Sequence, residues 1–134
     1  MSNAMKIVAA CAGAAGIATG AAFFVPATAS AASYGNQCGA GYNVIDTHEL
    51  KGGTIFLTYN GEKNCVVTVR DQPGAPVRMA AGVELSEGKK NVAIDEGQFT
   101  EYAGPVYVSA KGRCIDWAGI IGDDKWEIFD VHCQ

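Results

Sequence analysis

The imidazole side chains are the first candidates for chemistry, because a histidine oriented by a carboxylate can act as a general base. The chain has two histidines, His48 and His132. Alternation along an extended segment would place Asp46 and His48 on one face, as a base beside its orienting acid. No Gly-x-Ser-x-Gly elbow or comparable nucleophile signal accompanies this pair, and we expect His132 to be a surface residue. A polar strand face is the favoured interpretation, so we assign no catalytic residues and expect a protein that is not an enzyme.

Paired carboxylates are the second candidates, since glycosidases need two facing acids and calcium sites collect several carboxylate oxygens. The chain has 14 acidic residues, so many formal pairs exist and none is informative by itself. The adjacent pairs Asp95-Glu96 and Asp123-Asp124 fall in predicted loops and match no calcium-binding loop. We interpret them as solvated turn residues, and we expect neither a metal site nor a cofactor.

Aromatic rings beside carboxylates are the third candidates, because indole rings stack on the C–H faces of sugars and carboxylates accept hydrogen bonds from sugar hydroxyls. Trp117 and Trp126 lie near Asp116 and Asp130 in the sequence, and Tyr107 can belong to the same set. Two interpretations stay open. Both tryptophans lie in the core between two layers, or one face of the last hairpin is an exposed aromatic platform that binds ligand.

Residues 5–31 have the pattern of a secretory signal peptide. Lys6 precedes an apolar run rich in alanine and glycine, and the small residues Ala29 and Ala31 suit cleavage before Ala32, with a cut before Ser33 nearly as good. The run is too weakly hydrophobic for us to expect a stable membrane anchor. Residues 1–4 resemble an expression-tag remnant, which leaves residues 32–134 as one domain of about 100 residues.

Four cysteines remain after the expected leader, which removes Cys11: Cys38, Cys65, Cys114 and Cys133. An even number of cysteines in an exported protein predicts disulfides, and two bridges can be connected in three ways. A zinc site would show closely spaced cysteine or histidine ligands, which these positions lack. We therefore expect two disulfides.

The connectivity follows from the register of a predicted C-terminal hairpin. A turn centred in residues 122–125 (GDDK) places Cys114 opposite Cys133, and elimination then pairs Cys38 with Cys65. Both faces of this hairpin are apolar in that register: one carries Asp116, Ala118, Phe129 and Val131, and the other carries Ile115, Trp117, Trp126 and Ile128.

The elements that must position these residues are short β-strands. Alternation of apolar and polar residues predicts half-buried strands, and Asn60-Gly61 is a strong hairpin signal. No segment has a helical period, so any helix should be a single turn. The expected strands span residues 42–50, 54–59, 65–70, 77–85, 91–95, 105–110, 113–118 and 126–133. Seven or eight strands in about 100 residues predict a single all-β domain, an antiparallel sandwich or a small barrel.

Five stretches together resemble the spore-associated protein A family of actinomycetes. They are residues 38–42 (CGAGY), 64–70 (NCVVTVR), 102–108 (YAGPVYV), 114–117 (CIDW) and 132–133 (HC). The order and spacing of the four cysteines within these stretches carry the resemblance, which covers essentially the whole mature chain. It implies a small exported protein found with the spores or aerial hyphae of filamentous soil bacteria. It implies no reaction and carries no catalytic or binding residues.

Three function classes remain. The first is a secreted, non-catalytic protein associated with a spore or cell surface, and the second is a module that binds cell-wall polysaccharide. The third is a hydrolase inhibitor, which would present the loop of residues 71–76 or the turn of residues 119–125. The formal net charge of −4 disfavours nucleic acid and anionic membranes as partners, because both attract basic surfaces.

Overall fold

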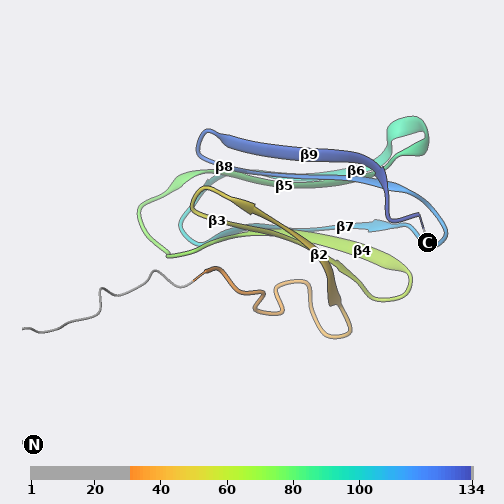
Figure 1. Cartoon of the computed structure of the whole chain (residues 1–134), viewed down its shortest axis with the longest axis horizontal. Helices are drawn as coiled ribbons and strands as arrows, with labels where there is room; N and C mark the ends of the chain where they lie inside the picture. Colours follow the sequence, from red (N-terminus) through yellow and green to blue (C-terminus); the bar gives the residue numbers. More distant parts are fainter. Residues whose placement is uncertain (1–30, 134) are drawn as a thin grey trace, which may run out of the picture.

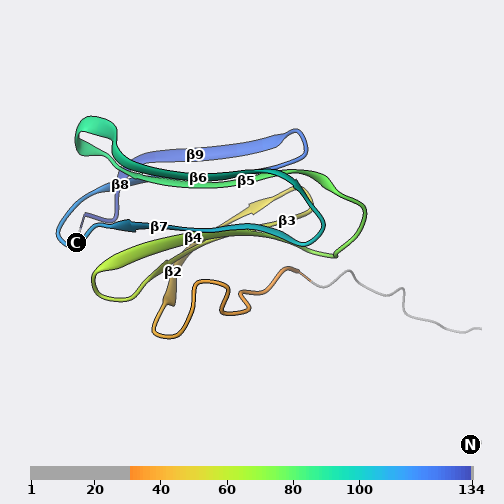
Figure 2. The same ribbon diagram turned by 180° about the vertical axis from the view of Figure 1, so that it is seen from behind.

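Two four-stranded antiparallel sheets pack face to face in residues 31–133, the part of the chain that the structure describes (Figures 1 and 2). In this computed structural model the first sheet has the order β2-β3-β4-β7 and the second sheet has the order β6-β5-β8-β9. The strands are β2 (Asn43–Leu50), β3 (Gly53–Tyr59), β4 (Lys63–Arg70), β5 (Val77–Leu85), β6 (Lys90–Phe99), β7 (Tyr102–Ser109), β8 (Ile115–Ile121) and β9 (Asp124–Val131), and a single-turn 3₁₀ helix, η1 (Glu87–Lys89), lies between β5 and β6. The expected tag remnant and, apart from Ala31, the expected signal peptide lie outside the described residues.

The predicted all-β antiparallel fold is confirmed, and the architecture is a sandwich of two separate sheets (Figure 1). The chain crosses from one sheet to the other after β4, β6 and β7. The inward side chains of the two sheets form the main core, which includes Ile55, Leu57, Val66, Met79, Val83, Val106, Ile115 and Trp117. Burial of these side chains supplies most of the hydrophobic stabilisation of the domain.

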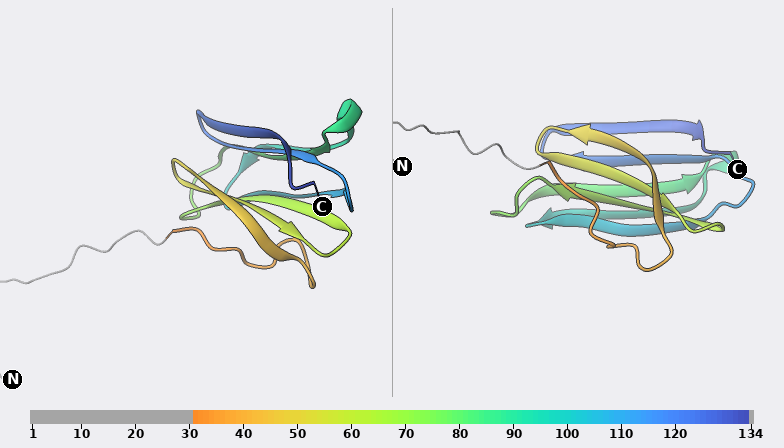
Figure 3. Two further views of the ribbon diagram at one scale, coloured as in Figure 1. Left: turned by 45° about the vertical axis from the view of Figure 1, so that its right-hand side comes forward. Right: turned by 60° about the horizontal axis from the view of Figure 1, so that its bottom comes forward.

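The two central strands of the first sheet, β3 and β4, are buried on both faces, whereas their alternation predicts burial of one face. Residues 31–42 run along the outer face of this sheet and cover it (Figure 3). A second, smaller core forms there from Cys38, Phe56, Cys65, Val67 and Val69, with Ala32, Tyr34 and Tyr42 packed at its margin. The prediction of half-buried strands was wrong here because a segment without regular structure supplies a third layer.

Strand β6 extends beyond the predicted segment and contains an acidic pair that the sequence analysis placed in a loop. Oδ2 of Asp95 accepts a hydrogen bond of 2.9 Å from the backbone N–H of Gly104. The carboxylate of Glu96 accepts two hydrogen bonds from Arg78 on the neighbouring strand β5. Interpreting both acids as solvated turn residues was wrong, because the pairing of β6 with β5 continues through them to Phe99.

Both predicted disulfides are confirmed. Cys38–Cys65 joins the covering segment of residues 31–42 to β4, and Cys114–Cys133 joins the two ends of the last hairpin. The bridges close loops with sequence separations of 27 and 19 residues. Such loops matter in a small domain, because a cross-link removes chain entropy mainly from the unfolded state.

The register of the last hairpin differs from the prediction. The turn is Gly122-Asp123. Near it, Gly119 pairs with Trp126, which is two positions earlier on β9 than the partner expected from a register with Cys114 opposite Cys133. An irregularity in β9 that includes Asp130, whose φ is 61°, takes up part of this offset. Val131 therefore lies on the core side of the sheet, although the predicted register placed it on one face with Asp116 and Phe129.

We expect the folded state to depend on both disulfides. Replacing Cys38 and Cys65 together by serine, or Cys114 and Cys133 together, should each lower the free energy of unfolding by roughly 3 kcal/mol, as expected for loops of this length. The check is thermal unfolding followed by circular dichroism, with the oxidised and the thiol-reduced wild type measured in parallel. An unchanged midpoint on reduction would contradict a stabilising role for the bridges.

Candidate functional site

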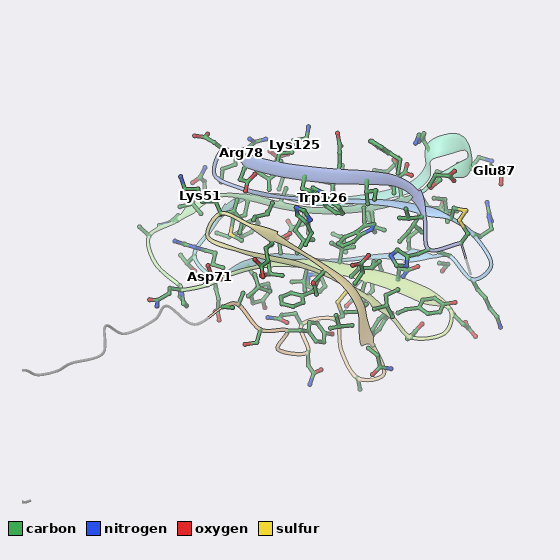
Figure 4. All side chains as sticks on the ribbon, in the orientation of Figure 1. Lys51, Asp71, Arg78, Glu87, Lys125 and Trp126 are labelled. Carbon is green, nitrogen blue, oxygen red and sulfur yellow. A yellow bond between two sulfur atoms is a disulfide. The ribbon has the colours of Figure 1, made fainter. Side chains whose placement is uncertain are left out.

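The two tryptophans lie at the contact between the sheets. Trp117 is buried, with 1% of its surface exposed, and Trp126 packs edge-on against it with 4.8 Å between ring centroids. The ring of His48 stacks on Trp126 at 4.1 Å. Figure 4 shows Trp126 between the sheets, whereas Lys125 points away from the outer side of β9. Of the two interpretations left open, a position in the core is the one that holds for both rings. They do not form an exposed platform.

Tyr107 and Asp130 do not join the tryptophans. Tyr107 lies on the outer face of the first sheet, where its hydroxyl donates a hydrogen bond of 2.9 Å to the backbone carbonyl of Cys38. Asp130 is exposed at the end of β9. The structure therefore distributes the five aromatic and acidic residues singled out in the sequence over separate places: Trp117 contacts Trp126 in the core, Asp116 bonds to the backbone of Asp130, and Tyr107 lies on the other sheet.

The histidines close the open side of the sandwich between β2 and β9. Nε2 of His132 lies 2.9 Å from Oδ2 of Asp46, so the partner of Asp46 is His132 and not His48, the candidate that alternation places on the same strand face. Oδ2 of Asp124 accepts a hydrogen bond of 2.7 Å from the backbone N–H of Lys51 beside the same opening. These contacts join residues from opposite sheets, which gives both histidines a structural part in closing the sandwich.

Asp116 is the most densely bonded carboxylate of the second sheet. Its Oδ1 accepts hydrogen bonds from the hydroxyl of Ser86 (2.6 Å) and from the backbone N–H of Asp130 (2.9 Å). Its Oδ2 lies 2.7 Å from Nζ of Lys89. The side chain is 6% exposed, so these partners compensate a buried charge. Asp116 thereby ties β8 to the turn after β5 and to the irregular segment of β9.

These contacts separate the pKa values of two neighbouring acids. Burial alone would raise the pKa of Asp116, but the hydrogen bonds from Glu84, Lys89, Ser86 and the backbone of Asp130 outweigh it and hold that pKa far below its usual range. Glu84 is the register partner of Asp116 on β5. Its hydrogen bond with Asp116, together with burial, raises the pKa of Glu84. The surroundings thus favour the ionised form of Asp116 and disfavour that of Glu84.

A shallow groove crosses the outer face of the second sheet beside these acids. Four residues paired across the strands form its base and sides. Gly82 and Ala118 are the base, and Ile94 on β6 and Glu127 on β9 are the sides. The two central residues are small, so the side chains of the edge strands stand above them as walls. The free volume is about 140 Å³, which is less than the roughly 300–1,000 Å³ of a typical small-molecule pocket.

The walls of the groove are apolar and exposed. Ile94 is 64% exposed, Val92 is 53% exposed and Phe129 is 52% exposed. Nζ of Lys89 lies 4.9 Å from the centroid of the Phe129 ring, a cation–π contact at the end of the groove. Exposed apolar side chains that gather on one face are typical of an interaction surface.

The sequence analysis named Asp116 but missed the groove around it. Glycine in the interior of a predicted strand is a signal for a close approach, and Gly82 lies in such a strand. The alternation that places Val92 and Ile94 on one face was also visible. What the sequence does not reveal is that this face lies outside the sandwich, because that depends on which sheet β6 joins.

The fold and the groove define a class of protein, a small two-sheet β-sandwich with two disulfides and one sheet face that no segment of residues 31–133 covers. The chain is 44% identical over 111 residues to Spore-associated protein A of Streptomyces coelicolor, an alignment that covers 80% of this chain and 71% of that protein. The chain therefore belongs to the spore-associated protein A family, as the five stretches indicated. No family model matches the chain, and no solved structure matches it. Within residues 31–133, no helix has the length and apolar character needed to cross a membrane.

The bonding of Asp116 predicts a pH-dependent contribution to stability. Asp116→Asn should lower the free energy of unfolding at pH 7 by about 2 kcal/mol, because Lys89 and the backbone N–H of Asp130 lose a charged acceptor. A carboxyl group whose pKa is lowered by folding stabilises the protein above the pKa of the unfolded chain, and this stabilisation is lost as the pH falls. The difference from wild type should thus shrink below about pH 4.

Urea unfolding between pH 3 and pH 7 measures this difference. Glu87→Gln is the control, because Glu87 is 89% exposed and reaches Arg113 at 4.0 Å, a contact that contributes little. A gap between wild type and Asp116→Asn that stays constant across this pH range would contradict the assignment of the ionised carboxylate.

Proposed function

We propose that this protein is a secreted, non-catalytic protein that attaches to the surface of spores. The observation that carries the proposal is the 44% identity with a protein whose name records association with spores. The identity spans 111 residues, so the comparison concerns most of the domain and not an isolated motif.

Secretion is supported by the cysteines and by the leader pattern. The four cysteines of the described part of the chain all lie in disulfides, and such bridges persist in oxidising compartments outside the cytoplasm. Residues 5–31 have the composition of a signal peptide. Both features are expected of a protein that reaches a cell or spore surface by export.

A non-catalytic role is supported by the surroundings of the polar residues that have the chemistry of catalysis. His132 pairs with Asp46, as a catalytic base would pair with its orienting acid. The neighbouring ring is that of Trp117, and no nucleophile among the described residues completes a catalytic arrangement. Asp116 is held by Ser86, Lys89 and a backbone N–H. These groups serve the fold, and the exposed apolar walls on the second sheet are suited to binding.

Binding to polysaccharide is the second candidate for the surface target, and it would have to use side chains other than the tryptophans. Trp117 is buried and Trp126 is covered by His48. Exposed aromatic rings remain at Phe129 on the second sheet and at Tyr102 and Tyr107 on the outer face of the first sheet. A flat stacking site for successive sugar rings is not assembled from them in the described structure, so we favour a protein component of the spore surface as the target.

Co-sedimentation tests the proposal. The oxidised mature protein, mixed with washed Streptomyces coelicolor spores, should bind saturably and should bind vegetative cell walls and chitin much less. Reduced and alkylated protein is the control for nonspecific adhesion of an unfolded chain. Equal sedimentation with all three materials, or none with spores, would contradict attachment to the spore surface, and preferential binding to chitin would favour the polysaccharide module.

A further inference from the structure

We infer that the groove on the outer face of the second sheet binds an extended peptide segment of a spore-surface protein, one in which basic and aliphatic side chains alternate. This inference rests on the proposed function and names the site and the partner for it. The groove is defined by Gly82, Ala118, Val92, Ile94, Glu127 and Phe129, with Glu84 and Asp116 at one end.

The shape of the groove fits one extended segment. The row Ile94, Gly82, Ala118 and Glu127 crosses all four strands. At the usual spacing between strands, the backbones of the two edge strands that carry the walls lie about 14 Å apart. A free volume of about 140 Å³ accommodates one or two side chains and not a larger organic ligand. An extended chain over a small-residue base can place every second side chain between the walls.

The outer faces of the two sheets differ in cover. Residues 31–42 bury the outer face of the first sheet around Phe56 and Val67. No described segment covers the outer face of the second sheet, and there Val92, Ile94 and Phe129 are each more than half exposed. Figures 1 and 3 show this asymmetry, with the covering segment beneath one sheet and open space above the other. The exposed side chains occupy the place where an additional layer would pack.

The charges around the groove specify the occupant. Three carboxylates line it, those of Glu84, Asp116 and Glu127, and no basic side chain is among the described residues that line it. Lys89 lies at the end, where its Nζ is 2.7 Å from Asp116 and 3.8 Å from Glu84, whereas Glu127 forms no ion pair with a described residue and is available to a ligand. Lys125 is exposed at the opposite end, next to the turn. Charge complementarity therefore favours a basic segment, oriented with its positive side chains toward Glu127.

The groove is held in shape before a ligand arrives. Asp116 fixes the irregular part of β9 through the N–H of Asp130, the residue that follows Phe129. Lys89, bonded to the same carboxylate, lies over the Phe129 ring. A wall that is already ordered costs less conformational entropy on binding.

Fluorescence anisotropy with synthetic peptides tests the site. The probe is a labelled peptide of alternating lysine and valine, and its matched control has glutamate in place of every lysine. Wild type should bind the basic probe, more weakly as salt rises, and should not bind the acidic one. The double variant Ile94→Ser, Glu127→Lys should weaken binding of the basic probe by roughly tenfold or more, because one apolar wall is lost and one charge is reversed.

A matched control variant is available on the first sheet. Ile45→Ser, Glu49→Lys changes an exposed isoleucine and an exposed glutamate on β2, and it should bind the basic probe as wild type does. Equal losses in the two variants, equal binding of the acidic peptide, or no binding of the basic probe would each overturn the inference. So would displacement of the basic probe from both variants alike by soluble chitosan, a polycation, since an anionic site outside the groove would then explain the binding.

Spore co-sedimentation of the same variants separates this inference from the proposed function. Wild type and the control variant should bind spores, and the groove variant should lose most of that binding. Spore binding that is equal in wild type and the groove variant overturns the inference while attachment to spores stands. A wild type that binds the basic probe but not spores overturns both the spore-surface partner and the proposed function.

Discussion

The buried carboxylate of Asp116 is the constraint on which the functional end of the molecule depends. A charge with so little exposure must be compensated, and Ser86, Lys89 and the backbone of Asp130 do so from two separate parts of the chain. Meeting this requirement fixes the turn after β5 and the irregular segment of β9 at the same time. The position of Phe129 and the cation that covers its ring follow from the bonding of one acid.

The rest of the sandwich reflects how a small domain distributes its apolar side chains. The main core occupies the space between the sheets, and a second core under residues 31–42 buries the outer face of the first sheet. The disulfide Cys38–Cys65 fixes that cover where packing alone is thin. The second sheet keeps small residues at its centre and apolar side chains on its edge strands, so the described structure leaves one sheet face suited to a partner (Figure 2).

Most of the fold is predictable from local patterns. The alternation of residues 54–59 and 65–70 and the Asn60-Gly61 turn identify β3 and β4, and the cysteine pairing follows from hairpin symmetry. Long-range contacts are less accessible: the pairing of Asp46 with His132 spans 86 residues and has no local signal. The irregularity of β9 at Asp130, whose backbone N–H bonds to Asp116, has no local signal either. The groove required knowledge of which sheet face remains uncovered.

Hydroxyl-radical footprinting of the protein free and bound to spores tests the central claim most directly, because it reports which face makes contact. The account predicts that Val92, Ile94 and Phe129 become protected on spores, while Tyr102, Tyr107 and Val44 on the first sheet stay as reactive as in the free protein. All six are substantially exposed before binding, so each can report a change. Protection of the first sheet with unchanged reactivity at Ile94 and Phe129 would contradict the account.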